Sequence, residues 1–260
     1  MQISLEGRSA IITGGSRGMG RAMSLRFAES GADVAIVSRS QDLLDETKAE
    51  VEAVAKGRVM AVSCDVTDAA AIADMFGTVN GEFGKVDILV NNAGTSARGP
   101  FEEITDEVWQ ADLDIKLFAA IRTCRLAMPG MKERRWGRIL NIVTVGAKAP
   151  GPGGAPTAVS RAAGMALTKV LAGEGAPYNV LVNALCTGKI ITDQVARRHQ
   201  KLRPDMSLED YLALEGEELP LGRLGDAEEY ANMACFLASD AASYITGAAV
   251  NIDGGLSPVL

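Results

Sequence analysis

Short apolar runs rich in β-branched residues alternate along the chain with longer segments of helical periodicity. We predict seven strands, at residues 10–13, 34–38, 59–62, 88–90, 138–143, 180–182 and 249–252. We expect the principal helices at residues 19–30, 41–54, 68–83, 106–132 and 157–174. Strands that are largely apolar on both sides are typical of a sheet covered by helices on both faces. The pattern therefore predicts a single α/β domain, a three-layer sandwich around a doubly wound parallel sheet.

The alternation breaks after the sixth strand, where two short helices replace a strand–helix unit. We expect these helices at about residues 192–202 and 207–217, the second opened by Ser207 as its cap. The insertion, at about residues 189–219, follows the carboxyl end of a strand, where doubly wound sheets bind ligands. We interpret it as a helical substrate lid within one domain of residues 1–260. The alternative is a helical pair that only covers the end of the sheet.

A glycine-rich loop joins the first strand to the first helix. Glycines let the backbone turn tightly and approach a pyrophosphate, and the helix N-terminus offers unpaired N–H donors. The residues expected to hold the pyrophosphate are Gly14, Ser16, Arg17, Gly18, Met19 and Gly20. A plain glycine-rich turn is the alternative, but the position between strand and helix is the context that the motif requires. The loop therefore predicts a dinucleotide-binding domain of the Rossmann type.

The end of the second strand indicates which dinucleotide is bound. NAD-specific sites usually place an acidic residue there to hold the ribose 2′-hydroxyl, whereas this strand ends with Ser38-Arg39-Ser40. The Arg39 guanidinium can pair with a 2′-phosphate, and Arg17 in the glycine loop is placed to help. The expected cofactor is therefore NADP(H), unless Arg39 is only a solvated surface residue.

Several further motifs make the chain resemble the short-chain dehydrogenase/reductase family over essentially its whole length. Residues 13–20, 64–66 and 91–94 are similar to the family's cofactor loop, adenine-binding segment and N-N-A-G motif. Residues 183–192 resemble the segment that cradles the nicotinamide, although Thr187 replaces the family's usual proline. Beyond the glycine loop, the resemblance implies cofactor contacts from Asp65, Val66, Asn92, Ala93, Gly94, Gly188, Ile190 and Thr192.

The resemblance also carries expectations about activity and assembly. It implies an oxidoreductase that acts on a small-molecule substrate. It further implies a homotetramer or homodimer, paired through the two long helices that follow the fourth and fifth strands.

The positions that match the family's catalytic residues carry other side chains in this chain. The resemblance places Thr144 at the family's serine, Thr157 at its tyrosine, Arg161 at its lysine and Lys116 at its asparagine. None of the four tyrosines lies on the helix of Thr157, so no shifted Tyr–Lys pair is available there. These four residues are the candidate catalytic positions, and Arg161 is also expected to hold the cofactor ribose.

The replaced side chains change the proton chemistry. Reduction of a carbonyl by hydride leaves an alkoxide-like oxygen, and the aliphatic hydroxyl of Thr157 is a far weaker acid than a phenol. Arg161 stays charged and cannot shuttle protons, whereas Thr144 can still hydrogen-bond a substrate oxygen. Lys116 is the one new group able to titrate, and burial near Arg161 is expected to lower its pKa.

Three functions remain open on this scaffold. The first is an NADP(H)-dependent oxidoreductase in which Lys116 or water supplies the proton; an imine or conjugated acceptor would need less acid help. The second is a protein that binds NADP(H) with little turnover, in a regulatory or assembly role. The third is a non-redox lyase or isomerase. We favour the first because the cofactor and lid segments look intact and the cofactor carries the hydride chemistry.

Composition excludes several other classes. The net charge of −7 disfavours a duplex nucleic-acid partner, which is bound through Lys and Arg, and no apolar run is long enough to span a membrane. The single histidine, His199, excludes a histidine-rich metal site, so no metal is expected. The four cysteines are widely spaced and no signal peptide is evident, so we expect reduced thiols in a cytoplasmic protein.

The first lid helix carries a basic cluster, formed by Arg197, Arg198, His199, Lys201 and Arg203. It would attract an anionic substrate, for instance a carboxylate or a phosphorylated carrier. A solvated helix face close to an acidic stretch at residues 209–218 is the favoured interpretation. Cys186 is expected to be a small buried side chain near the nicotinamide.

Overall fold

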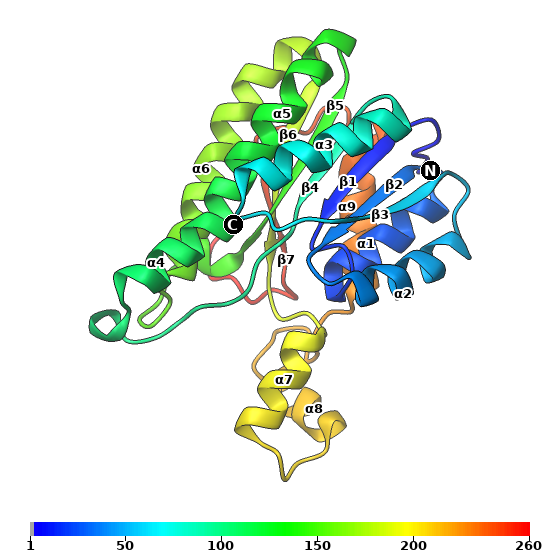
Figure 1. The fold of residues 1–260 in the computed structure, drawn as a ribbon. Helices are drawn as coiled ribbons and strands as arrows, with labels where there is room; N and C mark the ends of the chain where they lie inside the picture. Colours follow the sequence, from blue (N-terminus) through cyan, green and yellow to red (C-terminus); the bar gives the residue numbers. More distant parts are fainter. Residues whose placement is uncertain (1–2) are drawn as a thin grey trace.

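A seven-stranded sheet forms the centre of the computed structural model, which describes residues 3–260 (Figure 1). The strand order is β3-β2-β1-β4-β5-β6-β7, and every neighbouring pair is parallel. The strands are Ser9–Thr13 (β1), Asp33–Ser38 (β2), Val59–Ser63 (β3), Ile88–Asn91 (β4), Gly137–Thr144 (β5), Val180–Thr187 (β6) and Ala249–Ile252 (β7). The order reverses between β1 and β4, and doubly wound sheets bind ligands outside the carboxyl ends of the strands at such a point. We call this region the crevice.

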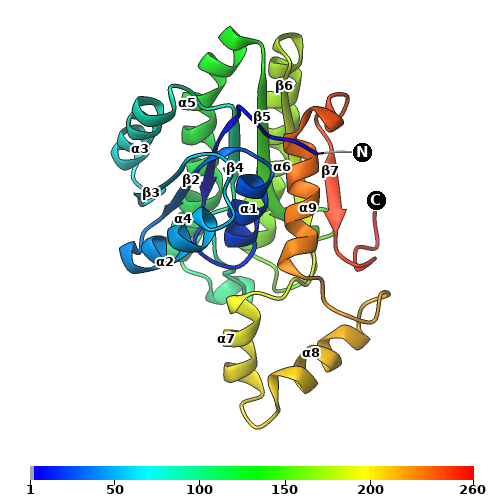
Figure 2. The same cartoon turned by 90° about the vertical axis from the view of Figure 1, so that its right-hand side faces the viewer.

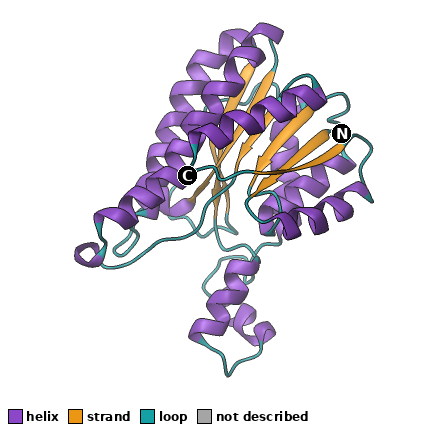
Figure 3. Cartoon of the chain, viewed as in Figure 1, coloured by secondary structure: helices purple, strands orange, loops and turns teal. Residues whose placement is uncertain are grey.

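Helices cover both faces of the sheet (Figures 2 and 3). α1, α2 and α9 lie on one face, and α3, α5 and α6 lie on the other. The helices are Gly18–Glu29 (α1), Gln41–Glu52 (α2), Ala69–Phe83 (α3), Asp106–Leu113 (α4), Ala119–Arg134 (α5), Thr157–Gly175 (α6), Asp193–Leu202 (α7), Leu208–Glu217 (α8) and Ala227–Ala238 (α9). The predicted single-domain, doubly wound α/β fold is confirmed. Within residues 3–260, no helix combines the length and apolarity that crossing a membrane requires.

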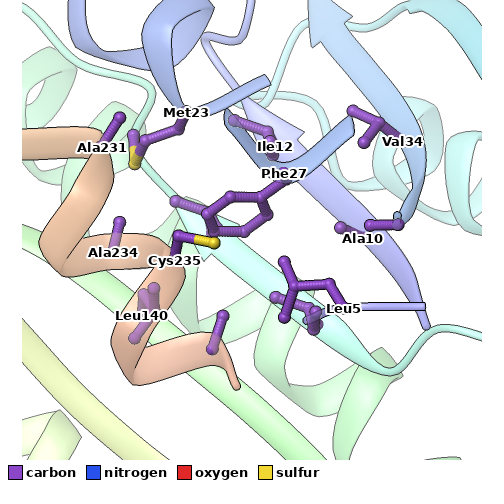
Figure 4. Packing of buried hydrophobic residues seen from close by; sticks show 14 of the residues in the cluster. Leu5, Ala10, Ile12, Met23, Phe27, Val34, Leu140, Ala231, Ala234 and Cys235 are labelled. Atoms are coloured by element: carbon purple, nitrogen blue, oxygen red, sulfur yellow. The ribbon is translucent and has the colours of Figure 1, made fainter. Parts of the chain in front are cut away.

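The core on the α1 face shows why the apolar pattern specifies this packing. Phe27 and Met23 of α1 are fully buried and lie against Cys235 of α9 and Ile12 of β1 (Figure 4). Each large apolar side chain buried in this way contributes roughly 1.5–3 kcal/mol. Because all five residues of β1 are buried, the strand that leads into the glycine loop is held rigidly from both faces.

The helix predicted over residues 106–132 is present, but its middle is not α-helical. A π-helical segment, Asp114–Phe118 (η2), lies between α4 and α5. A π turn bonds i to i+5 and shifts the following side chains around the axis, a change that apolar periodicity does not reveal. Lys116 lies in this segment and its side chain is buried.

The two helices after β6 form a hairpin that projects beyond the carboxyl ends of the strands (Figure 1). α7 and α8 start within one residue of the predicted positions. Ser207 caps α8 as expected, because its hydroxyl accepts a hydrogen bond from the Asp210 N–H at 3.0 Å. No residue of α7 is buried, so this helix packs only loosely on the rest of the chain.

A tryptophan at the amino end of β5 lies against two guanidinium groups. Arg8 is 3.6 Å and Arg138 is 4.3 Å from the centroid of a Trp136 ring. Asp240 accepts a hydrogen bond from Trp136 Nε1 at 2.9 Å and forms ion pairs with Arg138 at 3.3 Å and Arg8 at 3.5 Å. Arg138 is fully buried, and burial lowers its pKa to about 10. The Asp240 carboxylate therefore interacts with three donor groups: the indole N–H of Trp136 and the guanidinium groups of Arg8 and Arg138.

Replacement of this carboxylate should destabilise the protein although Asp240 is 69% exposed. Asp240→Ala leaves the buried Arg138 guanidinium without its carboxylate, and we expect a loss of about 1–3 kcal/mol in the free energy of unfolding. Urea unfolding followed by circular dichroism measures the change. The control is Glu133→Ala, an exposed acid on α5 whose removal should change stability by less than about 0.5 kcal/mol. Equal effects of the two substitutions would contradict the assignment.

Candidate active site and dinucleotide crevice

The loop between β1 and α1 has the backbone that a pyrophosphate needs. Gly14 and Gly18 have positive φ angles of 63° and 50°, a backbone conformation that residues with a Cβ atom rarely adopt. A Cβ on Gly20 would overlap the Gly14 carbonyl oxygen. Arg17, the N-cap residue of α1, makes no side-chain cap hydrogen bond, so the first-turn N–H groups face the crevice uncapped. These features fit a bound diphosphate.

The N-N-A-G segment after β4 supports this loop through Thr13. The Thr13 hydroxyl accepts from the N–H groups of Asn92 at 3.0 Å and Ala93 at 3.1 Å. The Asn92 side-chain amide donates in return to the carbonyl oxygens of Thr13 at 3.0 Å and Gly14 at 3.1 Å. An ideal Cβ on Gly14 would lie only 3.0 Å from Ala93 Cα. The two loops therefore interlock between β1 and β4, where the strand order of the sheet reverses.

The two arginines predicted to recognise a 2′-phosphate are both exposed. Arg39 lies 4.0 Å from Asp65, and Arg17 lies 3.7 Å from Asp193 at the start of α7. Ion pairs this long between exposed groups are worth less than about 1 kcal/mol. Both guanidinium groups therefore remain available to a phosphate. Hydrogen bonds from Thr67 lower the pKa of Asp65, which stays ionised.

The segment predicted to cradle the nicotinamide is anchored at both ends. The Gly188 N–H donates to the carbonyl oxygen of Ile252 in β7 at 3.0 Å, and Ile190 is buried. The side chain of Thr192 lies against the glycine loop, where a Cβ on Gly18 would be 3.1 Å from its methyl carbon. The segment thus runs from the end of β6 to the phosphate loop.

Four buried polar side chains from two helices meet beside the crevice: Asp112, Lys116, Thr157 and Ser160. We call this set the Lys116 network. The Lys116 ammonium forms an ion pair with Asp112 and donates to Thr157 Oγ1 at 2.7 Å. The second oxygen of Asp112 accepts from Ser160 Oγ at 2.5 Å. Each of these residues is no more than 5% exposed, so the network is shielded from solvent.

The hydroxyl of Thr157 also forms hydrogen bonds with the backbone of the segment that follows β4. It accepts from the Ala97 N–H at 2.9 Å and donates to the Ala97 carbonyl oxygen at 2.8 Å. A hydroxyl has one proton to donate and two lone pairs, and both lone pairs are occupied here by Ala97 and Lys116. Thr157 therefore joins Lys116 to the backbone of Ala97.

The expected fall in the pKa of Lys116 is present. Burial lowers this pKa to about 8, an effect that Asp112 opposes and the positive charges of Arg161 and Arg98 reinforce. Lys116 can therefore change its charge near neutral pH.

Arg161 lies one helical turn from Thr157, at the edge of the crevice. It donates from Nη1 to the carbonyl oxygen of Ile142 at 2.5 Å and packs against Gly94. Burial lowers the pKa of Arg161 to about 10, so it stays charged at neutral pH. A side chain on Gly94 would collide with the Arg161 guanidinium, which explains the glycine at this position.

Thr144 is separate from the Lys116 network. Its hydroxyl donates to the carbonyl oxygen of Thr187 at 3.3 Å and accepts from the Gly146 N–H at 3.4 Å. The structure thus joins Lys116 and Thr157 by a hydrogen bond, but within residues 3–260 it shows no hydrogen bond from Thr144 to either of them.

Two members of the network were not identified from the sequence. Asp112 precedes Lys116 by four residues, a spacing at which acid–base pairs meet on a helix, and this signal was available. Ser160 carries no sequence signal, because its contact with Asp112 joins α6 to α4 across the fold.

The basic cluster on α7 is engaged within the helical hairpin. Arg198 lies 3.6 Å from Glu215 of α8. His199 Nε2 lies 2.8 Å from the carbonyl oxygen of Met206, and its ring contacts Tyr211. These contacts agree with the interpretation of a solvated face near an acidic stretch. Cys186 is a fully buried side chain, as expected.

Comparisons with known proteins agree over nearly the whole chain. Residues 14–257 match the protein family described as "Enoyl-(Acyl carrier protein) reductase". The chain is 35% identical over 252 residues to 3-oxoacyl-(acyl-carrier-protein) reductase FabG of Thermotoga maritima, covering 97% of this chain and 98% of that protein. It is 37% identical over 258 residues to D-beta-hydroxybutyrate dehydrogenase of Cupriavidus necator, covering 96% and 98%. The structure of L-sorbose reductase from Gluconobacter frateurii, complexed with NADPH and L-sorbose, superimposes with a TM-score of 0.96 at 34% identity and covers all of both chains.

Proposed function

Since the chain belongs to the short-chain dehydrogenase/reductase family, whose relatives above are oxidoreductases, we propose that it is an NADP(H)-dependent oxidoreductase with Lys116 as its proton source. The observation that carries the proposal is the interlock between the glycine loop and residues 92–94, with Arg17 and Arg39 exposed beside it. The NADPH-bound relative supports the choice of cofactor.

Different residues around the crevice would bind the different parts of NADP(H). First-turn N–H groups of α1 would hold the pyrophosphate, and Arg39 with Arg17 would pair with the 2′-phosphate. Arg161 would hold the ribose, and residues 188–192 would contact the nicotinamide. When bound, the cofactor supplies or accepts a hydride.

The Lys116 network would supply the proton. Thr157 Oγ1 gives its proton to the substrate oxygen in place of the Ala97 carbonyl, and it takes a proton from Lys116 Nζ. Lys116 is left as a neutral amine, a form that its lowered pKa makes accessible, and water that enters the site when the product leaves returns the proton. Thr144 would hydrogen-bond the substrate oxygen, and the hairpin of α7 and α8 would cover the site as a lid.

The substrate class proposed is a small carbonyl, imine or conjugated compound. The relatives are described as acting on 3-oxoacyl groups, hydroxybutyrate and L-sorbose, which all carry a ketone or the matching alcohol. An imine or conjugated acceptor needs less help from an acid, which suits a site without a phenol.

A second candidate function is binding of NADP(H) with little turnover. The filled hydrogen-bonding capacity of Thr157 favours it, because a substrate oxygen must displace Ala97 to reach that hydroxyl. Such a protein would act in regulation or assembly.

A substrate panel with the purified protein tests these functions. The panel contains sugar ketones, 3-oxoacyl thioesters, cyclic imines and enones, and the absorbance of NADPH is followed with calorimetry of NADPH binding in parallel. Consumption of NADPH with any substrate class supports the oxidoreductase. Binding without consumption favours the second function, and substrate loss at constant NADPH absorbance indicates a lyase or isomerase. If no dinucleotide binds, both proposed functions are wrong.

We also propose that the protein is a homotetramer or homodimer through α5 and α6. Both helices expose apolar side chains, including Leu126 at 44%, Val159 at 51% and Val170 at 58%. The double variant Leu126→Glu and Val170→Glu should therefore shift the protein to monomers in size-exclusion chromatography with light scattering. Val54→Glu, an exposed apolar site on the opposite side of the sheet, is the matched control and should not dissociate the assembly. A monomeric parent protein would refute the proposal.

A further inference from the structure

Lys116 lies among two positive charges and one negative charge. The charged groups that act on it are Asp112 on its own helical segment, Arg161 on α6 and Arg98 in the segment after β4. Burial and the two arginines all favour the neutral amine. Within residues 3–260, Asp112 is the one acid in contact with the Lys116 ammonium, so the charged form depends on it.

Asp112 is itself held in a fixed orientation. One of its oxygens pairs with Lys116, and the other accepts the short hydrogen bond from Ser160 of α6. Thr157 Oγ1 is 3.3 Å from the first oxygen. The buried Lys116 ammonium pairs with this carboxylate and donates to Thr157, so it is aimed at Thr157 and not at solvent.

We propose that Asp112 is a positioning residue, which keeps Lys116 protonated and directed at Thr157, with Ser160 as its anchor. The inference deepens the proposed function, on which its role in proton supply rests. In the protein without cofactor or substrate, removal of the Asp112 charge should convert Lys116 to a neutral amine at neutral pH.

Titration of Lys116 tests this statement directly. In protein labelled with carbon-13 at the lysine ε-carbons, the Lys116 signal is assigned by its loss in Lys116→Arg and followed by NMR from pH 4 to 11. We expect a midpoint near pH 8 in the parent protein. In Asp112→Asn the midpoint should fall by about 1–3 pH units, because the opposite charge is removed at nearly constant shape.

Asp114→Asn is the matched control for this titration. Asp114 lies two residues further along the chain, and its carboxylate accepts a hydrogen bond from the Gln110 side-chain amide at 3.1 Å. Its removal should leave the Lys116 midpoint within about 0.5 pH units. An unchanged midpoint in Asp112→Asn, or equal shifts in both variants, would overturn the inference.

A second pair of variants keeps the inference testable if Asp112→Asn does not fold. Lys116→Met leaves the buried Asp112 carboxylate without its positive partner, which destabilises the ionised form in the folded protein but not the protonated form. The folded state should therefore be more stable at low pH and lose stability as rising pH ionises this carboxyl group. Lys116→Met should therefore lose melting temperature between pH 5 and 8, whereas Lys116→Met with Asp112→Leu should not. Parallel pH dependence of the two variants would contradict the pairing.

Activity separates this inference from the proposed function. If hydride transfer occurs, the pH profile of kcat/KM in Asp112→Asn should move with the NMR midpoint, and a profile that stays in place would overturn the role in proton supply. If the Lys116 midpoint moves but no substrate consumes NADPH, the oxidoreductase proposal fails and the pairing of Asp112 with Lys116 stands.

Discussion

A variant with a phenol in place of Thr157 should reduce simple ketones with NADPH about 10²–10⁴ times faster than the parent protein. The full set of changes is Thr157→Tyr, Arg161→Lys, Lys116→Asn and Asp112→Leu. A phenol beside an ammonium is a much better proton donor than an aliphatic hydroxyl, and a lysine at position 161 lies one turn from it on the same face of α6.

The structure shows why the first two changes need the other two. Lys116 Nζ lies 2.7 Å from Thr157 Oγ1, which is space that a phenol ring must use. Replacement of Lys116 alone would strand the buried carboxylate of Asp112, and a lone buried charge is strongly destabilising. Replacement of both partners together makes room for the ring without a lone buried charge.

The rate is measured as loss of NADPH absorbance with a panel of ketones. The matched control carries phenylalanine at position 157 in the same background, with the same ring and no hydroxyl. It should show no gain over the parent protein. If the tyrosine and phenylalanine variants are equally slow, residues 116, 157 and 161 do not surround the reacting oxygen, and the placement of the site is wrong.

The sequence was sufficient to predict the fold because the relevant signals are local. Apolar runs such as β1 and β4 are buried along their whole length, as a sheet covered on both faces requires. The glycine loop and the capping residue Ser207 act through backbone geometry within a few residues. Local rules of this kind can be applied without knowledge of the tertiary structure.

The site was predicted only in part because its contacts cross the fold. The lowered pKa of Lys116 followed from expected burial near Arg161, and the structure agrees. The partnership with Asp112 has the i, i+4 spacing of a helical ion pair, but the anchor on Ser160 depends on how α6 packs against α4. The hydrogen bonds between Thr157 and Ala97 join positions 60 residues apart, which no periodicity indicates.

The second large effect is expected on cofactor binding, because Arg39 should discriminate between NADPH and NADH, which differ by the 2′-phosphate. Arg39→Ala should weaken NADPH binding roughly 10–100-fold, since a charge-assisted pair with a phosphate is worth about 1.5–3 kcal/mol. NADH binding should change by less than about threefold, because that dinucleotide offers the arginine no 2′-phosphate. The Arg39 side chain is 71% exposed, so the difference should shrink as salt is raised.

Calorimetric titration of both dinucleotides into Arg39→Ala and into the control Arg26→Ala measures this discrimination. Arg26 is a partly exposed arginine of α1 that pairs with Glu29 in the last turn, and its loss should affect neither dinucleotide. An equal loss of NADPH and NADH binding in Arg39→Ala would show that the arginine supports the crevice and does not read the phosphate. Unchanged NADPH binding in Arg39→Ala would mean that Arg39 is only a solvated surface residue. The proposed preference for NADP(H) over NAD(H) would then lose its structural basis.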